Sequence, residues 1–121
     1  PLIMQPEQSK LVTSKAVIRA AKSLGLCSDT LAGVIKLDTA TTAMLWAGDH
    51  LLTPDVEAWG RSVLLVSLFD KLLTIVGGSE ADAQLWLLSA NRAFENQAPI
   101  DLMITDDGLD RLVRYLCSFT R

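Results

Sequence analysis

The sequence has few of the residues from which catalytic and metal sites are built. It contains one histidine, His50, and two cysteines, Cys27 and Cys117, which stand far apart. No Gly-x-Ser-x-Gly motif accompanies His50, and Gly77-Gly78 lacks the spacing of a phosphate-binding loop. We expect His50 to lie in an exposed loop and both cysteines to be small, reduced, buried residues. The inventory therefore predicts no catalytic residue, no cofactor and no metal site, and it favours a binding protein over an enzyme.

Long apolar runs and an excess of basic charge are also missing. No uninterrupted apolar stretch reaches the ~20 residues that span a membrane, and no secretory signal pattern stands at the start. We therefore expect a cytoplasmic protein without a membrane partner. The formal net charge of −3 disfavours a protein whose main ligand is nucleic acid. Half of the residues are hydrophobic, which is enough for a folded core and leaves a surplus for an interface.

Helical periodicity is what the sequence does contain. Residues 13–24 repeat apolar side chains at i, i+3, i+4 and i+7, which is typical of a helix with one buried face. The polar residues 1–10 before them are expected to form a loose arm. Two short helices, at about 29–36 and 39–47, are separated by only two residues, the dimensions of a helix-turn-helix. We predict an all-α fold whose N-terminal unit, residues 11–53, is a helix-turn-helix-like bundle.

The remaining residues, 54–121, predict a long central helix joined to a small helical C-terminal domain. Thr53-Pro54-Asp55 has the pattern of a helix start, and Gly77-Gly78 ends the helix. This helix is apolar nearly all round, which is typical of an element at the centre of a fold or of an oligomer. Three further helices are predicted at about 80–88, 100–104 and 106–119, the first of them capped by Ser79.

Two stretches carry a resemblance to a known family. Around the predicted helix-turn-helix stand Leu24-Gly25-Leu26-Cys27-Ser28, Leu45-Trp46-Ala47-Gly48 and Leu51-Leu52-Thr53-Pro54. The second stretch is more specific: Trp86-Leu87, then Asn91, Phe94, Pro99, Asp101, Leu102 and Gly108, before an amphipathic terminal helix. Together, over residues 11–121, they resemble the Xre/MbcA/ParS antitoxins, which have an N-terminal helix-turn-helix and a C-terminal toxin-binding domain.

The sequence departs from the family pattern at several positions. Arg92 replaces a proline, and Glu95, Asn96 and Gln97 stand in place of a loop glycine. In the helix-turn-helix, Lys36 replaces the turn glycine and Met44 replaces a frequent arginine. The predicted recognition helix therefore lacks the bidentate contact between arginine and guanine.

The resemblance implies an antitoxin that binds a cognate RES-domain toxin, an enzyme that consumes NAD or transfers from it, and covers its active site. Since aromatic residues and arginine dominate interface hot spots, we predict as toxin-binding residues Trp86, Asn91, Phe94, Arg114, Tyr115, Phe119 and Arg121. Alternatives remain for several of them. Trp86 can be core, Phe94 can anchor the loop under the last helix, and the arginines can be a solvated helix end.

The resemblance also implies a homodimer that represses its own promoter. We predict weak or toxin-assisted operator DNA binding by Lys15, Arg19, Lys22, Lys36, Thr39, Thr41 and Thr42. A solvated basic face is the alternative for the first three. Dimer contacts are predicted for Trp59, Val63 and Phe69, with core packing as the alternative. The alternative function is a stand-alone helix-turn-helix transcription regulator with a C-terminal dimerisation domain, and a small helical enzyme comes last.

Overall fold

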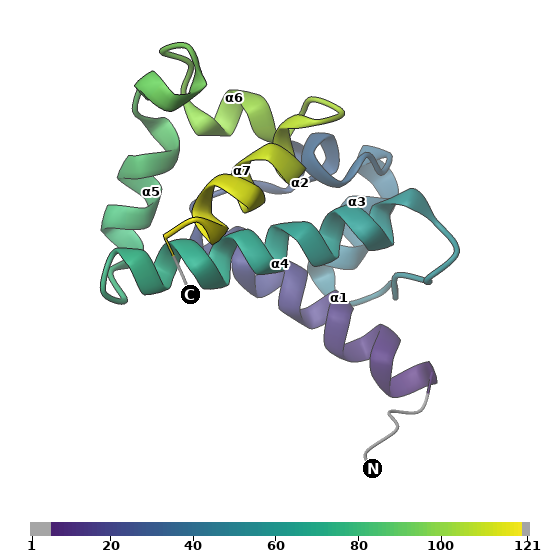
Figure 1. Cartoon of the computed structure of the whole chain (residues 1–121). Helices are drawn as coiled ribbons and strands as arrows, with labels where there is room; N and C mark the ends of the chain where they lie inside the picture. The colour runs from purple at the N-terminus through teal and green to yellow at the C-terminus, as the bar shows by residue number, and fades with distance from the viewer. Residues whose placement is uncertain (1–5, 120–121) are drawn as a thin grey trace.

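The fold is all-α, as predicted (Figure 1). The computed structural model describes residues 6–119, with side chains from residue 8 onward. Within these residues there is no β-strand, only an isolated bridge between Asn91 and Gln97. The helices are α1 (Pro6–Ser23), α2 (Ser28–Ile35), α3 (Thr39–Ala47), α4 (Glu57–Ile75), α5 (Glu80–Leu88), the 3-10 turn η1 (Arg92–Phe94), α6 (Pro99–Met103) and α7 (Gly108–Cys117).

Two helices begin where local capping predicts. The Asp38 carboxylate accepts the Thr41 N–H at 2.8 Å, and α3 ends at Gly48 in a left-handed conformation, so the predicted bounds are confirmed. The Ser79 hydroxyl accepts the Asp82 N–H at 3.1 Å and starts α5. These bonds satisfy backbone groups that a helix end leaves unpaired.

Two other starts differ from prediction. Helix α1 begins at Pro6, so residues 6–10 are helical rather than part of a loose arm; residues 1–5 lie outside the described range. Helix α4 begins at Glu57, after Val56, and not at the Thr53-Pro54-Asp55 motif. The Asp55 carboxylate bonds to Thr53, which lowers the pKa of Asp55 and holds these residues in a turn.

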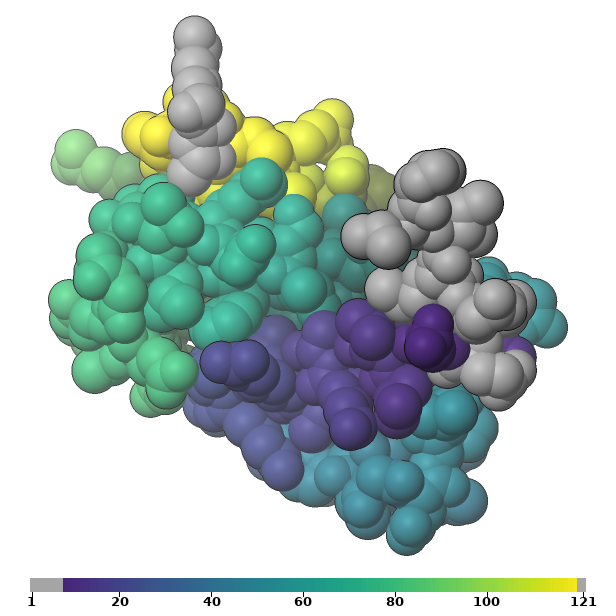
Figure 2. Space-filling view, turned by 90° about the horizontal axis from the view of Figure 1, so that it is seen from below, coloured from purple at the N-terminus to yellow at the C-terminus, as the bar shows by residue number. Residues whose placement is uncertain are grey.

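The core is built around α4. This helix packs against α7 on one side and α1 on the other, and Figure 2 shows α1 between α4 and the α3 end of the molecule. Leu65, Leu68 and Leu72 of α4 are fully buried, as are Leu112 of α7 and Val17 of α1. Among the described residues no single helix is long and apolar enough to span a membrane, although α4 and α5 together pass as a pair bent by 112°.

A buried arginine ties the first half of the fold to the second. The Arg61 guanidinium of α4 donates to four backbone carbonyls: Val34 at 2.6 Å, Met103 at 2.9 Å, Thr105 at 3.1 Å and Asp106 at 3.2 Å. No described carboxylate pairs with it, so its charge is stabilised by carbonyl dipoles. The end of α2 and the turn between α6 and α7 are thereby fixed to one side chain.

The turn between α2 and α3 is also bonded to the segment between α6 and α7. Lys36 ends α2 in a left-handed conformation, φ 57°, as the turn glycine of the family pattern would. Its ammonium group donates to the Ile104 carbonyl at 3.1 Å and lies 3.3 Å from the Asp106 carboxylate. Lys36 is thus a tether between the α2–α3 pair and the C-terminal helices.

The isolated cysteine and histidine positions need one correction. Both cysteines are free but exposed rather than buried. Cys27 precedes α2, where its thiol lies 3.2 Å from the Thr30 hydroxyl, and this bond lowers the pKa of the thiol. His50 is half-buried in the loop after α3. Among the described residues, no cluster of three or more histidine, cysteine or acidic side chains has the geometry of a metal site.

Candidate protein-binding site

A chain of four aromatic rings links the C-terminal helices. Trp86 of α5 lies 6.3 Å from Phe94 of η1, Phe94 lies 4.9 Å from Tyr115 of α7, and Tyr115 lies 5.0 Å from Phe119, all between ring centroids and all edge-to-face. Edge-to-face pairs stabilise beyond the area that they bury. This series of rings connects the core to the surface, because Phe94 is 1% exposed and Phe119 is 59% exposed.

The loop that carries Phe94 is held in one conformation by backbone and side-chain bonds. The Asn91 amide oxygen accepts the Ala93 N–H at 2.9 Å, and the Asn91 N–H donates to the Gln97 carbonyl at 3.1 Å. Glu95 and Asn96 are left-handed, at φ 54° and 65°. The loop therefore makes its turn without the glycine of the family pattern.

Arg111 of α7 fastens this loop to the last helix. Its guanidinium donates to the Ala93 carbonyl and to both Glu95 carboxylate oxygens at 3.0–3.1 Å, and it lies over the Phe94 ring at 5.2 Å. The arginine holds the pKa of the Glu95 carboxyl below its usual range. Sequence analysis missed Arg111, because its partners lie 16–18 positions away in an irregular loop.

Large apolar side chains on the same half of the chain are solvent-exposed. Leu85 and Leu88 of α5 are each 64% exposed, and Ile104 is 49% exposed. Leu85 and Leu88 are three residues apart and share a helix face. Sequence analysis missed both, although there was a signal: residues 83–88 of a short helix are apolar except Gln84, and a surface helix buries only one face. Exposed apolar patches mark interaction sites.

The structure brings most of the predicted toxin-binding residues together. Trp86, Asn91, Tyr115 and Phe119 lie along or beside the aromatic chain. Phe94 is too buried for direct contact, which agrees with the alternative that it anchors the loop. Arg114 is exposed and pairs with Asp110 at 3.0 Å, and Arg121 lies outside the described residues.

The predicted DNA-binding residues do not form one surface. Lys15, Arg19 and Lys22 lie on an exposed flank of α1. The Lys36 ammonium group instead bonds to the Ile104 carbonyl and to Asp106, between α6 and α7. Thr42 is fully buried, and its hydroxyl donates to the Asp38 carbonyl, so it is unavailable to DNA. The burial of Thr42 contradicts its prediction, whereas Lys36 is exposed and stays a prediction. Thr39 is exposed and Thr41 is half-buried at the start of α3.

The predicted dimer residues divide into two groups. Val63 is 47% exposed on α4, and Trp59, one turn before it, is half-buried. Phe69 is six residues after Val63, which places it about 120° away around the helix. Phe69 lines a separate groove between α4 and α1, opposite Val12.

Comparisons with known proteins point to the same half of the chain. Residues 71–118 match the sequence model of the antitoxin Xre/MbcA/ParS C-terminal toxin-binding domain. This range includes the aromatic chain up to Tyr115, and it confirms the resemblance of the C-terminal stretch. The fold is similar to a chain of the crystal structure of the M. tuberculosis MbcT–MbcA toxin–antitoxin complex, with a TM-score of 0.67 and 23% identity over 88% of this chain and 92% of that chain. No curated protein matches the sequence.

Proposed function

We propose that this protein is the antitoxin of a toxin–antitoxin pair and that its α5–α7 half binds the cognate toxin. The observation that carries the proposal is the match of residues 71–118 to an antitoxin toxin-binding domain. Two features of the same residues support it: the aromatic chain that reaches the surface at Phe119, and the exposed apolar pair Leu85 and Leu88. A soluble protein keeps such side chains exposed where a partner covers them.

The proposed toxin-binding surface combines predicted residues with those that the fold adds. Trp86, Asn91, Arg114, Tyr115 and Phe119 would make the predicted contacts, and Leu85 and Leu88 extend them along α5. Phe94 supports Trp86 and Tyr115 from below rather than touching the toxin. Arg121 stays in the contact set as a prediction from the sequence.

The identity of the toxin follows from the family resemblance. We propose a RES-domain toxin that consumes NAD or transfers from it, neutralised in the cytoplasm when the antitoxin covers its active site. The exposed Phe119 favours this mode of inhibition, because an aromatic side chain beyond the last helix is suited to enter a cleft.

Repression of the operon is a second role, assisted by the toxin. The observation that favours it is the α2–α3 pair with its left-handed turn at Lys36, the geometry of a helix-turn-helix. The exposed face of α3 carries Thr39, Ala40, Ala43 and Met44 and no charge, so the expected affinity for DNA is low. A homodimer through Trp59 and Val63 would bring two such helices to one operator.

Co-expression with the product of the adjoining reading frame tests the proposal. The antitoxin should restore growth and co-purify with that product. Phe119→Ala and Leu85→Ala should each weaken binding by about tenfold, as hot-spot truncations do. Met44→Ala, an apolar truncation at a 48% exposed residue of α3, is the control and should leave binding unchanged. If the unmodified chain neither restores growth nor co-purifies with that product, the antitoxin role is wrong and a stand-alone regulator is favoured.

A further inference from the structure

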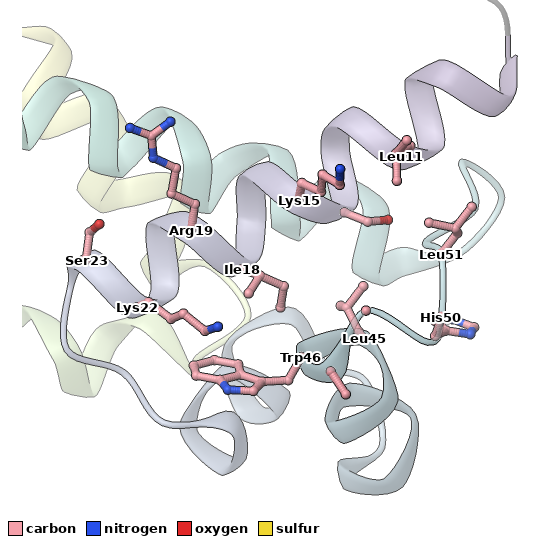
Figure 3. A pocket seen from close by; sticks show the side chains of 13 residues that line it. Leu11, Lys15, Ile18, Arg19, Lys22, Ser23, Leu45, Trp46, His50 and Leu51 are labelled. Atoms are coloured by element: carbon pink, nitrogen blue, oxygen red, sulfur yellow. The ribbon is translucent and has the colours of Figure 1, made fainter.

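A groove on the other half of the molecule has no role in the proposed toxin contact. It lies between α1 and the end of α3, encloses about 410 Å³, and is closed at one end by residues 50–51 (Figure 3). We call it the α1–α3 groove. Its volume falls within the range of known ligand sites. The apolar part of its lining is Leu11, Ile18, Leu45, Trp46 and Leu51.

Three cations border this groove and have no acidic partner. Lys15, Arg19 and Lys22 line it from α1, and none of its lining residues is acidic. Lys15 and Arg19 also line the second groove, between α1 and α4, whose lining includes Asp70 and Glu80. None of the three forms an ion pair with a described residue, in a chain whose net charge is −3. Only Lys22 is engaged, with its ammonium group 5.3 Å from the centroid of the Trp46 ring. The groove therefore joins an apolar wall to an unneutralised basic edge.

The spacing of the cations indicates the shape of the ligand. Positions 15, 19 and 22 follow the i, i+4, i+7 repeat, so they share one flank of α1 over about 10 Å. In Figure 3 Ile18 and Lys22 point toward Trp46, whereas the charged ends of Lys15 and Arg19 lie on the upper side of α1, facing away from Trp46. An incoming helix with acidic residues at the same repeat would match all three charges. A small molecule with a single anionic group would match only one.

We propose that the α1–α3 groove binds an amphipathic helix of a partner protein, with its apolar face on Ile18 and Trp46 and acidic side chains along Lys15, Arg19 and Lys22. Helix-in-groove recognition uses this combination of an apolar stripe with flanking charges. DNA is the rival ligand for the same cations. Phosphates would neutralise the basic edge but would leave the apolar wall uncovered, so DNA accounts for only half of the site.

Fluorescence anisotropy of the full chain with labelled probes tests the proposal. The main probe is a helical model peptide of about 14 residues, made of Leu, Ala and Glu, with the glutamates on one edge at i, i+4 and i+7. A scrambled peptide of the same composition keeps the charge and removes the amphipathic pattern. A fluorescent DNA duplex of about 20 base pairs represents the rival ligand.

Two matched pairs of variants locate the contact. Leu11→Asp places a negative charge in the α1–α3 groove. Val12→Asp is its control, because Val12 is also exposed on α1 but lines the other groove, between α1 and α4. Lys22→Glu reverses a charge at the groove, whereas Lys71→Glu reverses one on α4 that lines neither groove. Circular dichroism of each variant confirms that it is folded before binding is measured.

The proposal predicts that the amphipathic peptide binds at least about tenfold more tightly than the scrambled peptide. Leu11→Asp and Lys22→Glu should each weaken that binding by about tenfold or more, and the two controls should not. Equal binding of both peptides would contradict the proposal, as would tight DNA binding that Lys22→Glu abolishes and Leu11→Asp leaves unchanged. Since these probes exclude the toxin, the result is independent of the antitoxin role.

Discussion

Two buried serines differ in whether their hydroxyl groups have a hydrogen-bond partner. The Ser14 hydroxyl of α1 accepts the Leu52 N–H at 2.9 Å, whereas the Ser62 hydroxyl of α4 is fully buried with no partner among the described residues. Ser62→Ala should raise the free energy of unfolding by about 1 kcal/mol, because it removes a desolvated polar group from a helix. Ser14→Ala should lower it by about 1 kcal/mol. Urea denaturation measures both, and equal signs would contradict this account.

Gly108 occupies a position with no room for a side chain. A Cβ at this residue would overlap with the Leu102 carbonyl oxygen and the Thr105 hydroxyl, at the turn that begins α7. Gly108→Ala should lower the free energy of unfolding by about 3 kcal/mol. Gly60 is the control, since a Cβ there meets no atom within 4 Å, and Gly60→Ala should stabilise α4 by up to about 1 kcal/mol. A tolerated Gly108→Ala would show that the turn can move.

At the scale of the residue, sequence predicts what depends on near neighbours. The Asp38 and Ser79 caps bond to amides three residues ahead, so the pattern alone was sufficient. Gly108 was predicted only from the family resemblance, whereas the need for glycine there comes from close contact with the Leu102 carbonyl and Thr105. The exposure of Cys27 and Cys117 was mispredicted, because Cys27 precedes the first residue of α2 and Cys117 is the last residue of α7.

At the scale of the element, Lys36 combines two opposing effects at the end of α2. A left-handed backbone costs a non-glycine residue about 1–2 kcal/mol, while the tether to the Ile104 carbonyl and Asp106 offsets part of that cost. Lys36→Ala keeps the backbone cost and loses the tether, and Lys36→Gly loses both. The glycine variant should therefore exceed the alanine variant by about 1 kcal/mol in the free energy of unfolding. Thermal or urea denaturation measures the difference between the two variants. A glycine variant less stable than the alanine variant would contradict the explanation.

Arg61 joins α2, α4 and the α6–α7 turn, and its removal should affect all three. Arg61→Leu leaves four carbonyls without their donor and should lower the free energy of unfolding by about 3 kcal/mol or more. Arg61→Lys should lose less, although one ammonium group cannot reproduce the planar fork. Arg92→Leu, at an exposed arginine, is the matched control and should change stability by less than about 0.5 kcal/mol. A similar small effect at Arg61 would contradict its proposed role.

The sequence predicts where the α-helices lie, but it does not predict every first and last residue. Apolar repeats, caps and helix breaks together predicted the seven α-helices of residues 6–119, but not the 3-10 turn η1. The start of α4 was misplaced: residues 54–56 form a turn, and the helix begins at Glu57 after Val56. Arg61 lies within a long apolar pattern, and its partners come from the end of α2 and from residues 103–106, so no local pattern identified its role.

At the scale of the whole molecule, the proposed toxin-binding surface is assembled from separate segments. Trp86, Phe94, Tyr115 and Phe119 come from α5, η1, α7 and the residues after α7, and folding puts their rings in contact. Trp86 and Phe94 belong to the stretch that resembles the family, whereas Tyr115 and Phe119 were chosen because aromatic residues dominate interface hot spots. Only the structure shows that the four rings are adjacent. The apolar stretch 83–88 indicates that some apolar side chains of α5 stay exposed, but only the packing of α5 shows that these are Leu85 and Leu88.

Amide hydrogen exchange on the complex with the co-expressed toxin tests the central claim most directly. Binding by the α5–α7 half predicts slower exchange in Glu80–Leu88 and Gly108–Cys117, and no change in α1 or in the α2–α3 pair. Phe119→Ala should reduce that protection in proportion to the loss of affinity. Protection confined to α1–α3, with α5–α7 exchanging as in the free protein, would contradict the assignment of residues 71–118 as the toxin-binding surface.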